Sequence, residues 1–431
     1  MPLRLCGLFM FLYNLSIHLF GLAIRIASHF NPKAKLWIEG RKNIFEKLKT
    51  TIDPSAKIIW FHVASLGEFE QGRPVIECMR QQFPQHKILL TFFSPSGYEI
   101  RKNYAGAESI FYLPLDTKRN AQQFIAIVKP QMAIFVKYEF WIHYINALHN
   151  NKIPIYSISS IFRADQIYFK SYGKFYADAL KKIAFFFVQN EESKKLLQSI
   201  ERNNVMISGD TRFDRVAQNV ASVKPIPVIE KFVQNKPVLI AGSTWPKDEA
   251  LLLELINQTK TDYKFIIAPH QIHQEQIDGF IKKLNVTAIK FSKSEKEDTS
   301  KARVMIIDNV GMLTSIYQYG SISYIGGGFG AGIHNILEPS VFMMPVLFGP
   351  NYHKFQEAHD LLKIKSAFVI NKALELIEIF NRLAKEKQET NPFAALVPPP
   401  QFEYFKSKVG ATNLIVDKIC SLNKLNSSIR K

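Results

Sequence analysis

The stretch SYIGGGFGAGIHNILEP, residues 323–339, is central to the interpretation of this chain. It predicts a short buried strand, then a glycine-rich loop, then the start of a helix. Five glycines among residues 326–332 let the backbone turn sharply and let a ligand approach it closely. The free N–H groups at the start of the helix would point at an anion.

Three polar residues, His334, Asn335 and Glu338, fall on the first turn of that predicted helix. Asn335 and Glu338 are three residues apart, so they share one face. A carboxylate beside an anion site suits the hydroxyls of a sugar better than a phosphate. The pattern therefore indicates a nucleotide-sugar site, with backbone N–H groups for phosphate and Glu338 for ribose. A tight strand–helix turn with a capping residue is the alternative, because a glycine-rich turn alone is a weak signal.

The same order of strand, polar loop and helix recurs along the whole chain. We expect strands at residues 57–63, 88–93, 109–113, 132–137, 153–157, 185–188, 205–208, 238–241, 264–268, 303–307, 322–325 and 345–348. Strands that alternate with helices predict an α/β fold with parallel, doubly wound sheets. Pro225, Pro227 and Pro237 mark a boundary between two such domains.

The expected organisation has five parts. We place an N-terminal membrane anchor at 1–30, a first domain at 31–220, a linker at 221–236, a second domain at 237–400 and a C-terminal helix at 401–431. A length of 431 residues suits two domains with additions, at about 150 residues for each domain.

Composition and charge narrow the class of partner. The net charge of +18 is spread along the chain and favours an anionic partner: nucleic acid, phospholipid headgroups or a phosphorylated substrate. No zinc-finger or RNA-binding signature is present, which argues against nucleic acid. Three widely spaced cysteines imply neither a disulfide framework nor a zinc site. The chain has no Asp-x-Asp motif and no P-loop, and His270 and His273 have no third candidate ligand, so we expect no metal.

Residues 5–24 carry no charged side chain and are bracketed by Arg4 and Arg25. Their length matches the ~30 Å of a hydrocarbon core. A membrane anchor, a cleaved signal peptide and a buried helix all fit, and we favour membrane association because Arg25 follows directly and no cleavage site stands out. The basic cluster that follows would touch anionic headgroups on the cytoplasmic face or form a solvated helix face (Lys33, Lys35, Arg41, Lys42, Lys47 and Lys49).

Charged residues follow three predicted strands of the first domain. Glu68 and Glu139 come after the strands at 57–63 and 132–137, and Arg212 comes after the last strand. In open α/β sheets the active groups lie beyond the carboxyl ends of the strands, so Glu68 is placed as a general base would be. Arg212 could meet an anionic substrate. The alternatives are a carboxylate that stabilises a helix N-terminus for Glu68 and surface loops for Glu139 and Arg212.

The motifs ASLGE at 64–68, EFW at 139–141, GDTRFD at 209–214 and HNILEP at 334–339 occur in this order. With them, nearly the whole chain resembles the 3-deoxy-D-manno-octulosonic acid (Kdo) transferases of lipopolysaccharide biosynthesis. The resemblance implies a GT-B fold, in which two Rossmann-like domains face each other across a cleft. It implies transfer of Kdo from CMP-Kdo to lipid IVA with inversion at the anomeric carbon, without a metal or other cofactor. It also implies an enzyme anchored to the phospholipids of the inner membrane by its N-terminus, with its catalytic domains facing the cytoplasm.

The resemblance also assigns roles to residues. Glu68 matches the general base, and Glu139 and Arg212 match residues that support the transition state. Three segments match those that contact CMP: Pro269 and His270; Val310, Gly311 and Met312; and His334, Asn335, Ile336, Leu337 and Glu338. The chain departs from the family at four places, since Arg is common at position 270, Lys at 212, Glu at 312, and Gly-Gly in place of the Gly-Ala-Gly-Ile before His334. Two alternatives stay open: another GT-B transferase that uses a UDP-sugar and a lipid acceptor, and a non-catalytic, membrane-bound nucleotide-sugar-binding protein.

Overall fold

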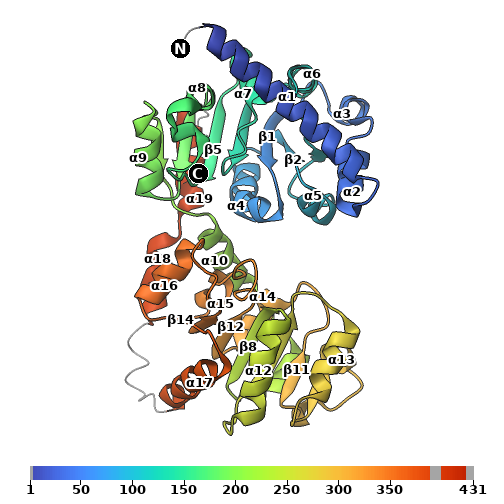
Figure 1. Ribbon diagram of the computed structural model, residues 1–431, viewed down its shortest axis with the longest axis vertical. Coiled ribbons are helices and arrows are strands. Elements are labelled where there is room, and N and C mark those ends of the chain that lie inside the picture. Colours follow the sequence, from blue (N-terminus) through green and yellow to red (C-terminus); the bar gives the residue numbers. More distant parts are fainter. Residues whose placement is uncertain (1–2, 389–398, 424–431) are drawn as a thin grey trace. The chain divides into compact units, whose positions relative to one another are not determined.

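The computed structural model describes residues 3–388 and 399–423. These residues form two compact units, the first made of Met1–Arg215 with Lys408–Lys431 and the second of Val216–Ser407. Each unit is built on one seven-stranded, wholly parallel sheet with helices on both faces (Figure 1). The two doubly wound, Rossmann-like units confirm the predicted GT-B class of fold. Residues 392–401 contain four prolines and predict a connector, but most of them lie outside the described residues.

The sheet of the first unit has the strand order β3-β2-β1-β4-β5-β6-β7. Its strands are β1 Lys57–Val63, β2 His86–Phe92, β3 Ser109–Tyr112, β4 Met132–Val136, β5 Ile155–Ser160, β6 Phe185–Val188 and β7 Val205–Ile207. They read as continuous apolar runs because a parallel sheet is buried on both faces. Trp60 of β1 packs into the core on one face, and Ile59 and Phe61 pack into the core on the other. The helices after these strands are α4 Leu66–Gln82, α5 Pro95–Arg101, α6 Lys118–Val128, α7 Ile142–Asn150, α8 Lys174–Leu180, α9 Glu191–Ser199 and α10 Arg212–Ser222.

The N-terminal helix α1, Leu3–Ala27, lies along the surface of the first unit (Figure 1). Tyr13 and Ile17 are 9% and 8% exposed, whereas Phe11 and Leu19 are 62% and 54% exposed. The Tyr13 hydroxyl donates to the Asp116 carboxylate, so the helix is docked by a narrow face. Its outer face is apolar and open, which excludes the buried-helix interpretation. Gly7–Ala27 is long and apolar enough to cross a membrane. Helices α2 Pro32–Gly40 and α3 Ile44–Thr51 follow.

The sheet of the second unit has the strand order β10-β11-β9-β8-β12-β13-β14. Its strands are β8 Val238–Thr244, β9 Lys264–Pro269, β10 Ala288–Lys290, β11 Val304–Ile306, β12 Ile322–Ile325, β13 Val346–Phe348 and β14 Ala367–Val369. All twelve predicted strands are present in the two sheets. The two strands at the edges of this sheet, β10 and β14, were not predicted.

The helices of the second unit begin inside the segment expected to be a linker. Helix α11, Pro227–Val233, packs Ile229 and Phe232 into the core of this unit. The further helices are α12 Pro246–Gln258, α13 Gln274–Lys282, α14 Leu313–Ile316, α15 Leu337–Val341, α16 Gln356–Lys363, α17 Ala373–Gln388 and α18 Pro400–Lys408.

The chain ends by returning to the first unit, where α19, Ala411–Leu422, packs against α4. The Asp214 carboxylate holds the start of α19. It accepts hydrogen bonds from the N–H groups of Gly410 and Thr412 and from the Thr412 hydroxyl, each at 2.6 Å. Asp214 therefore acts as a capping residue for a helix almost two hundred residues away.

We expect Asp214→Ala to lower the free energy of unfolding by about 2–3 kcal/mol, because it removes a helix cap and leaves buried donors unpaired. Denaturant unfolding followed by circular dichroism measures this loss. Asp165→Ala is the control, since Asp165 is 77% exposed at the side chain and pairs with Arg163 at 3.6 Å. The control should change stability by less than about 0.5 kcal/mol. Equal stability of the two variants would show that Asp214 does not hold α19.

Candidate active site

Two carboxylates lie beyond the carboxyl ends of adjacent strands in the first unit. Glu68 is in the first turn of α4, directly after β1, and Glu139 follows β4, which pairs with β1. Glu68 is only 7% exposed, and its Oε2 accepts the Ala64 N–H at 2.6 Å. Glu68 thus does stabilise the start of a helix, as the alternative interpretation held. That bond engages one carboxylate oxygen, so it is compatible with a second role for the group.

Burial raises the proton affinity of both carboxylates, and the charge of Glu68 raises that of Glu139 further. Burial raises the pKa of Glu68, against the lowering effect of the Ala64 N–H and the Lys137 charge. Burial, together with the negative charge of Glu68, raises the pKa of Glu139 to about 8. Near neutral pH, Glu139 is therefore mainly protonated and Glu68 carries the negative charge. One residue of the pair can accept a proton, and the other can donate a hydrogen bond.

A buried histidine orders the loop that carries Glu139. The Trp141 Nε1–H donates to His62 Nε2 at 3.1 Å, which assigns the His62 proton to Nδ1. His62 Nδ1 lies 2.9 Å from Thr91 Oγ1, and Glu139 Oε2 lies 4.0 Å from His62 Nε2. Burial lowers the pKa of His62 to about 3, so the ring is neutral. The sequence analysis did not single out His62, because its importance depends on β1 and β4 being neighbours.

Arg212 is held in place at the start of α10. Its Nη2 and Nε lie 2.7 and 2.8 Å from Asp210 Oδ2. The Thr211 hydroxyl donates to the Gln71 carbonyl, and the Gln71 side chain donates to Asp210 at 3.4 Å. Gln71 is three residues beyond Glu68 on α4, so the structure ties the Arg212 segment to the helix that carries Glu68. The Arg212 side chain is 29% exposed and can meet a ligand.

In the second unit, the glycine-rich loop connects β12 to α15 as predicted, but most of its N–H groups have partners within the protein. The N–H of Gly327, whose φ is +92°, donates to Asp248 at 2.9 Å. The N–H groups of Gly330 and Gly332 both donate to the Gly327 carbonyl. A Cβ on Gly328 would lie 2.6 Å from the backbone of Gly349. These glycines therefore make a tight turn, and the loop offers an anion fewer donors than the sequence suggested.

Helix α15 begins later than predicted, at Leu337, so His334 and Asn335 precede it and only Glu338 lies in its first turn. Asn335 and Glu338 are nevertheless in contact. The Asn335 side-chain NH₂ donates to Glu338 Oε1 at 3.0 Å, and the Asn335 Oδ1 accepts the Leu337 N–H at 3.1 Å. The Thr314 hydroxyl, which the sequence analysis missed, donates to Glu338 Oε2 at 2.8 Å. Ile336 and Leu337 are 1% and 0% exposed, so the structure leaves neither residue open to a ligand.

Three flat rings stack beside this turn. Trp245, His270 and His334 follow β8, β9 and β12, which are neighbours in the sheet. The ring centroids of His270 lie 4.7 Å from Trp245 and 4.4 Å from His334. The Trp245 Nε1–H donates to His334 Nε2 at 3.1 Å. Burial, and then the nearby His270, lowers the pKa of His334 to about 4. Trp245 was missed, although its position directly after a strand was the available signal.

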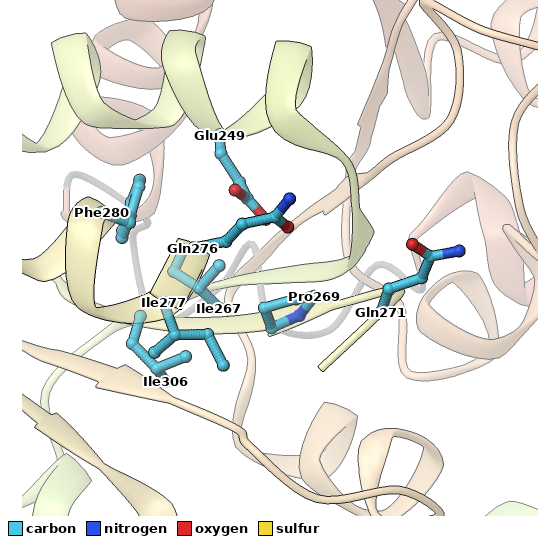
Figure 2. Close-up of a pocket in the computed structure, with 8 residues that line it drawn as sticks. All are labelled: Glu249, Ile267, Pro269, Gln271, Gln276, Ile277, Phe280 and Ile306. Carbon is cyan, nitrogen blue, oxygen red and sulfur yellow. The ribbon is translucent and has the colours of Figure 1, made fainter. Parts of the chain in front are cut away.

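The two remaining predicted segments differ in character. Val310 is 86% exposed, and Gly311 next to it has a φ of +91°, so this loop is open to a ligand. Pro269 lies instead beside a small hollow with Glu249, Gln271 and Gln276 (Figure 2). That cavity measures about 10 Å³, which is room for about one water molecule. A nucleotide therefore cannot occupy the hollow in Figure 2.

Comparison with known proteins identifies a family and individual proteins that are similar to this chain. Residues 27–215, which include Glu68, Glu139 and Arg212, match the family described as 3-deoxy-D-manno-octulosonic-acid transferase (kdotransferase). The chain is 27% identical over 341 residues to the 3-deoxy-D-manno-octulosonic acid transferase of Aquifex aeolicus, covering 77% of this chain and 87% of that protein. It is 26% identical over 374 residues to a bifunctional glycosyltransferase/methyltransferase of Fusobacterium nucleatum, covering 81% of this chain but only 58% of that protein.

Among solved structures, a UDP-GlcNAc 2-epimerase from Neisseria meningitidis superposes with a TM-score of 0.57 at 15% identity, covering 85% of this chain and 100% of that one. At this identity the likeness is one of fold. It agrees with the two Rossmann-like units of this chain.

Proposed function

Because this chain belongs to the Kdo transferase family, we propose that it is an inverting glycosyltransferase that moves Kdo from CMP-Kdo to lipid IVA in lipopolysaccharide biosynthesis. The observation that carries the proposal is the buried pair of Glu68 and Glu139 at the carboxyl edge of the first sheet. A hydroxyl that attacks the anomeric carbon must lose its proton. Glu68, the member of the pair that is ionised near neutral pH, is placed to accept it.

The proposed step balances without a cofactor. The acceptor oxygen forms a bond to the anomeric carbon of Kdo as the bond from that carbon to the CMP phosphate breaks. The acceptor proton moves to Glu68, and CMP leaves with the electron pair of the broken bond. Arg212 would offset the negative charge that develops on the leaving phosphate. Protonated Glu139 would donate a hydrogen bond to the donor sugar instead of repelling its carboxylate.

The second unit would bind the nucleotide. The stacked rings of Trp245, His270 and His334 offer a flat surface for a base. Asn335 and Glu338 present an amide and a carboxylate of the kind that bind ribose hydroxyls. The open apolar face of α1 would hold the enzyme at the inner membrane, where its acceptor lies.

The test is transfer of Kdo to lipid IVA by membranes that contain the chain, supplied with a CMP-Kdo-generating system. We expect a product whose mass counts the Kdo residues added. Protection of the purified chain from thermal unfolding by CMP but not by UDP would support the assigned donor. If a folded preparation yields no product and UDP protects, the proposal fails in favour of a UDP-sugar transferase.

His62 yields a prediction about positioning. We expect His62→Asn to lower kcat by about tenfold or more, because asparagine is too short to accept the Trp141 N–H and the Glu139 loop loses its support. His62→Gln should retain most of the activity, because its Oε1 can take the place of Nε2. The two variants are matched in polarity. Their kcat values, measured beside their melting temperatures, separate positioning from stability. Equal kcat values would show that the bond to Trp141 is dispensable.

A further inference from the structure

A large cavity lies between α1, α2, α3 and the start of α6, and neither Glu68 nor Glu139 is among its lining residues. Its volume is about 950 Å³. One wall is a single face of α1, since His18, Gly21, Leu22 and Arg25 line the cavity at the spacing i, i+3, i+4 and i+7. The opposite walls are the turn between α2 and α3 and the first turn of α6. A space of this size accommodates a polar lipid headgroup.

The lining is rich in cations that lack partners. Arg25, Lys42 and Arg119 line the cavity and are exposed. Within the described part of the chain, none of these three has an acidic partner. Glu39 and Glu46 also line the cavity, but their carboxylates lie 3.9 and 3.1 Å from Lys35 and Lys49, which are outside the lining. The cavity therefore keeps an excess of positive charge.

A buried guanidinium adds to this charge. Arg41 donates to the carbonyls of Trp37, Leu113 and Phe93, and its guanidinium carbon lies 3.6 Å from the centre of the Trp37 ring. All three acceptors are neutral, and the described residues supply Arg41 with no carboxylate. The first residues of α3 and α6 also line the cavity, and the N-terminus of a helix carries partial positive charge. Apart from Glu39 and Glu46, which pair with lysines outside the lining, the charged side chains of the lining favour an anion.

The outer side of the cavity is apolar. Leu22 lines it and is 51% exposed, and its neighbours on the open face of α1, Leu19 and Ile26, are 54% and 57% exposed. An occupant would meet cations at one end and open leucine and isoleucine side chains at the other. A phospholipid has this combination of an anionic phosphate and acyl chains, whereas inorganic phosphate lacks the apolar part.

We propose that this cavity binds the phosphate of an anionic phospholipid headgroup, with the acyl chains lying along the exposed face of α1. The inference rests on the membrane association proposed above and adds a defined lipid site to it. The lipid would add to the contacts of Tyr13 and Ile17 that already dock α1 on the first unit.

The test is flotation of the full chain with vesicles that contain no acceptor. One set is phosphatidylethanolamine alone, and the other includes phosphatidylglycerol. We expect Arg25→Gln, Lys42→Gln and Arg119→Gln together to weaken binding to the anionic vesicles by about tenfold or more. The matched control is Lys33→Gln, Lys47→Gln and Lys118→Gln, which removes three exposed cations from α2, α3 and α6 without touching the lining. The control should bind within about threefold of the wild type.

Each other outcome overturns the inference. If both triple variants lose vesicle binding equally, the attraction comes from diffuse positive charge and not from this cavity. If neither variant loses vesicle binding, the apolar face of α1 alone binds the membrane. A difference that appears only when lipid IVA is added would assign the cavity to the acceptor. If the wild type binds neither kind of vesicle, membrane association itself fails, which is distinct from failure of the site. Melting temperatures of both variants exclude unfolding as the cause.

Discussion

Replacing Glu68 by glutamine is expected to lower kcat for Kdo transfer by about 10³-fold, within the 10²–10⁴-fold range of a lost general base. Glutamine matches glutamate in shape but cannot accept the proton of the acceptor hydroxyl. Its Oε1 can still accept the Ala64 N–H that Glu68 binds at 2.6 Å. The variant should therefore bind CMP as the wild type does. The measurement is single-turnover transfer to lipid IVA at saturating donor.

Stability separates this role from a purely structural one. Burial raises the pKa of Glu68, so its charge disfavours the folded state near neutral pH, and Glu68→Gln should melt at the wild-type temperature or above it. A residue that only capped α4 would give the reverse result, with lowered stability and retained activity. Glu77→Gln, farther along α4 and paired with Arg73 at 2.7 Å, is the control and should keep nearly full activity. If the Glu68→Gln enzyme folds and keeps the wild-type kcat, Glu68 is not the general base and another group must accept the proton.

The pH dependence of the transfer rate is expected to reflect the titration of Glu139. Its pKa of about 8 means that the enzyme loses the Glu139 proton above that pH. Transfer should then fall about tenfold for each further pH unit if the protonated form is needed. Glu139→Gln keeps a neutral hydrogen-bonding group, so its profile should lack this alkaline fall. Rates measured from pH 6 to pH 10 test the difference, and an unchanged alkaline fall in Glu139→Gln would assign it to another group.

The same carboxyl should make stability depend on pH. The unfolded chain loses the Glu139 proton near its ordinary pKa of 4.5, whereas the folded chain keeps it until about pH 8. Between these values the folded state binds the extra proton, so stability falls as the pH rises. Denaturant unfolding of the wild type and of Glu139→Gln between pH 5 and pH 9 measures this decline. We expect it to be smaller in the variant, and parallel curves would show that Glu139 titrates normally.

From the sequence we could predict the two parallel sheets, the apolar helix near the N-terminus and the positions of Glu68, Glu139 and Glu338 after strands. These follow from local patterns: apolar runs mark buried strands, and polar residues after them mark the edge where sites form. Four motifs in a fixed order gave the resemblance to the Kdo transferase family. The family match over residues 27–215 agrees with that resemblance.

Which of these residues lie close together depends on the tertiary fold. The pairing of β1 with β4 places Glu139 where the charge of Glu68 raises its pKa, and the order β9-β8-β12 stacks Trp245, His270 and His334. The structure also showed that the N–H groups of Gly327, Gly330 and Gly332 bond within the protein. The physical reason is that pKa values, stacking and hydrogen-bond partners depend on distances between segments far apart in the chain. Such distances follow from strand order and packing, which a local pattern does not encode.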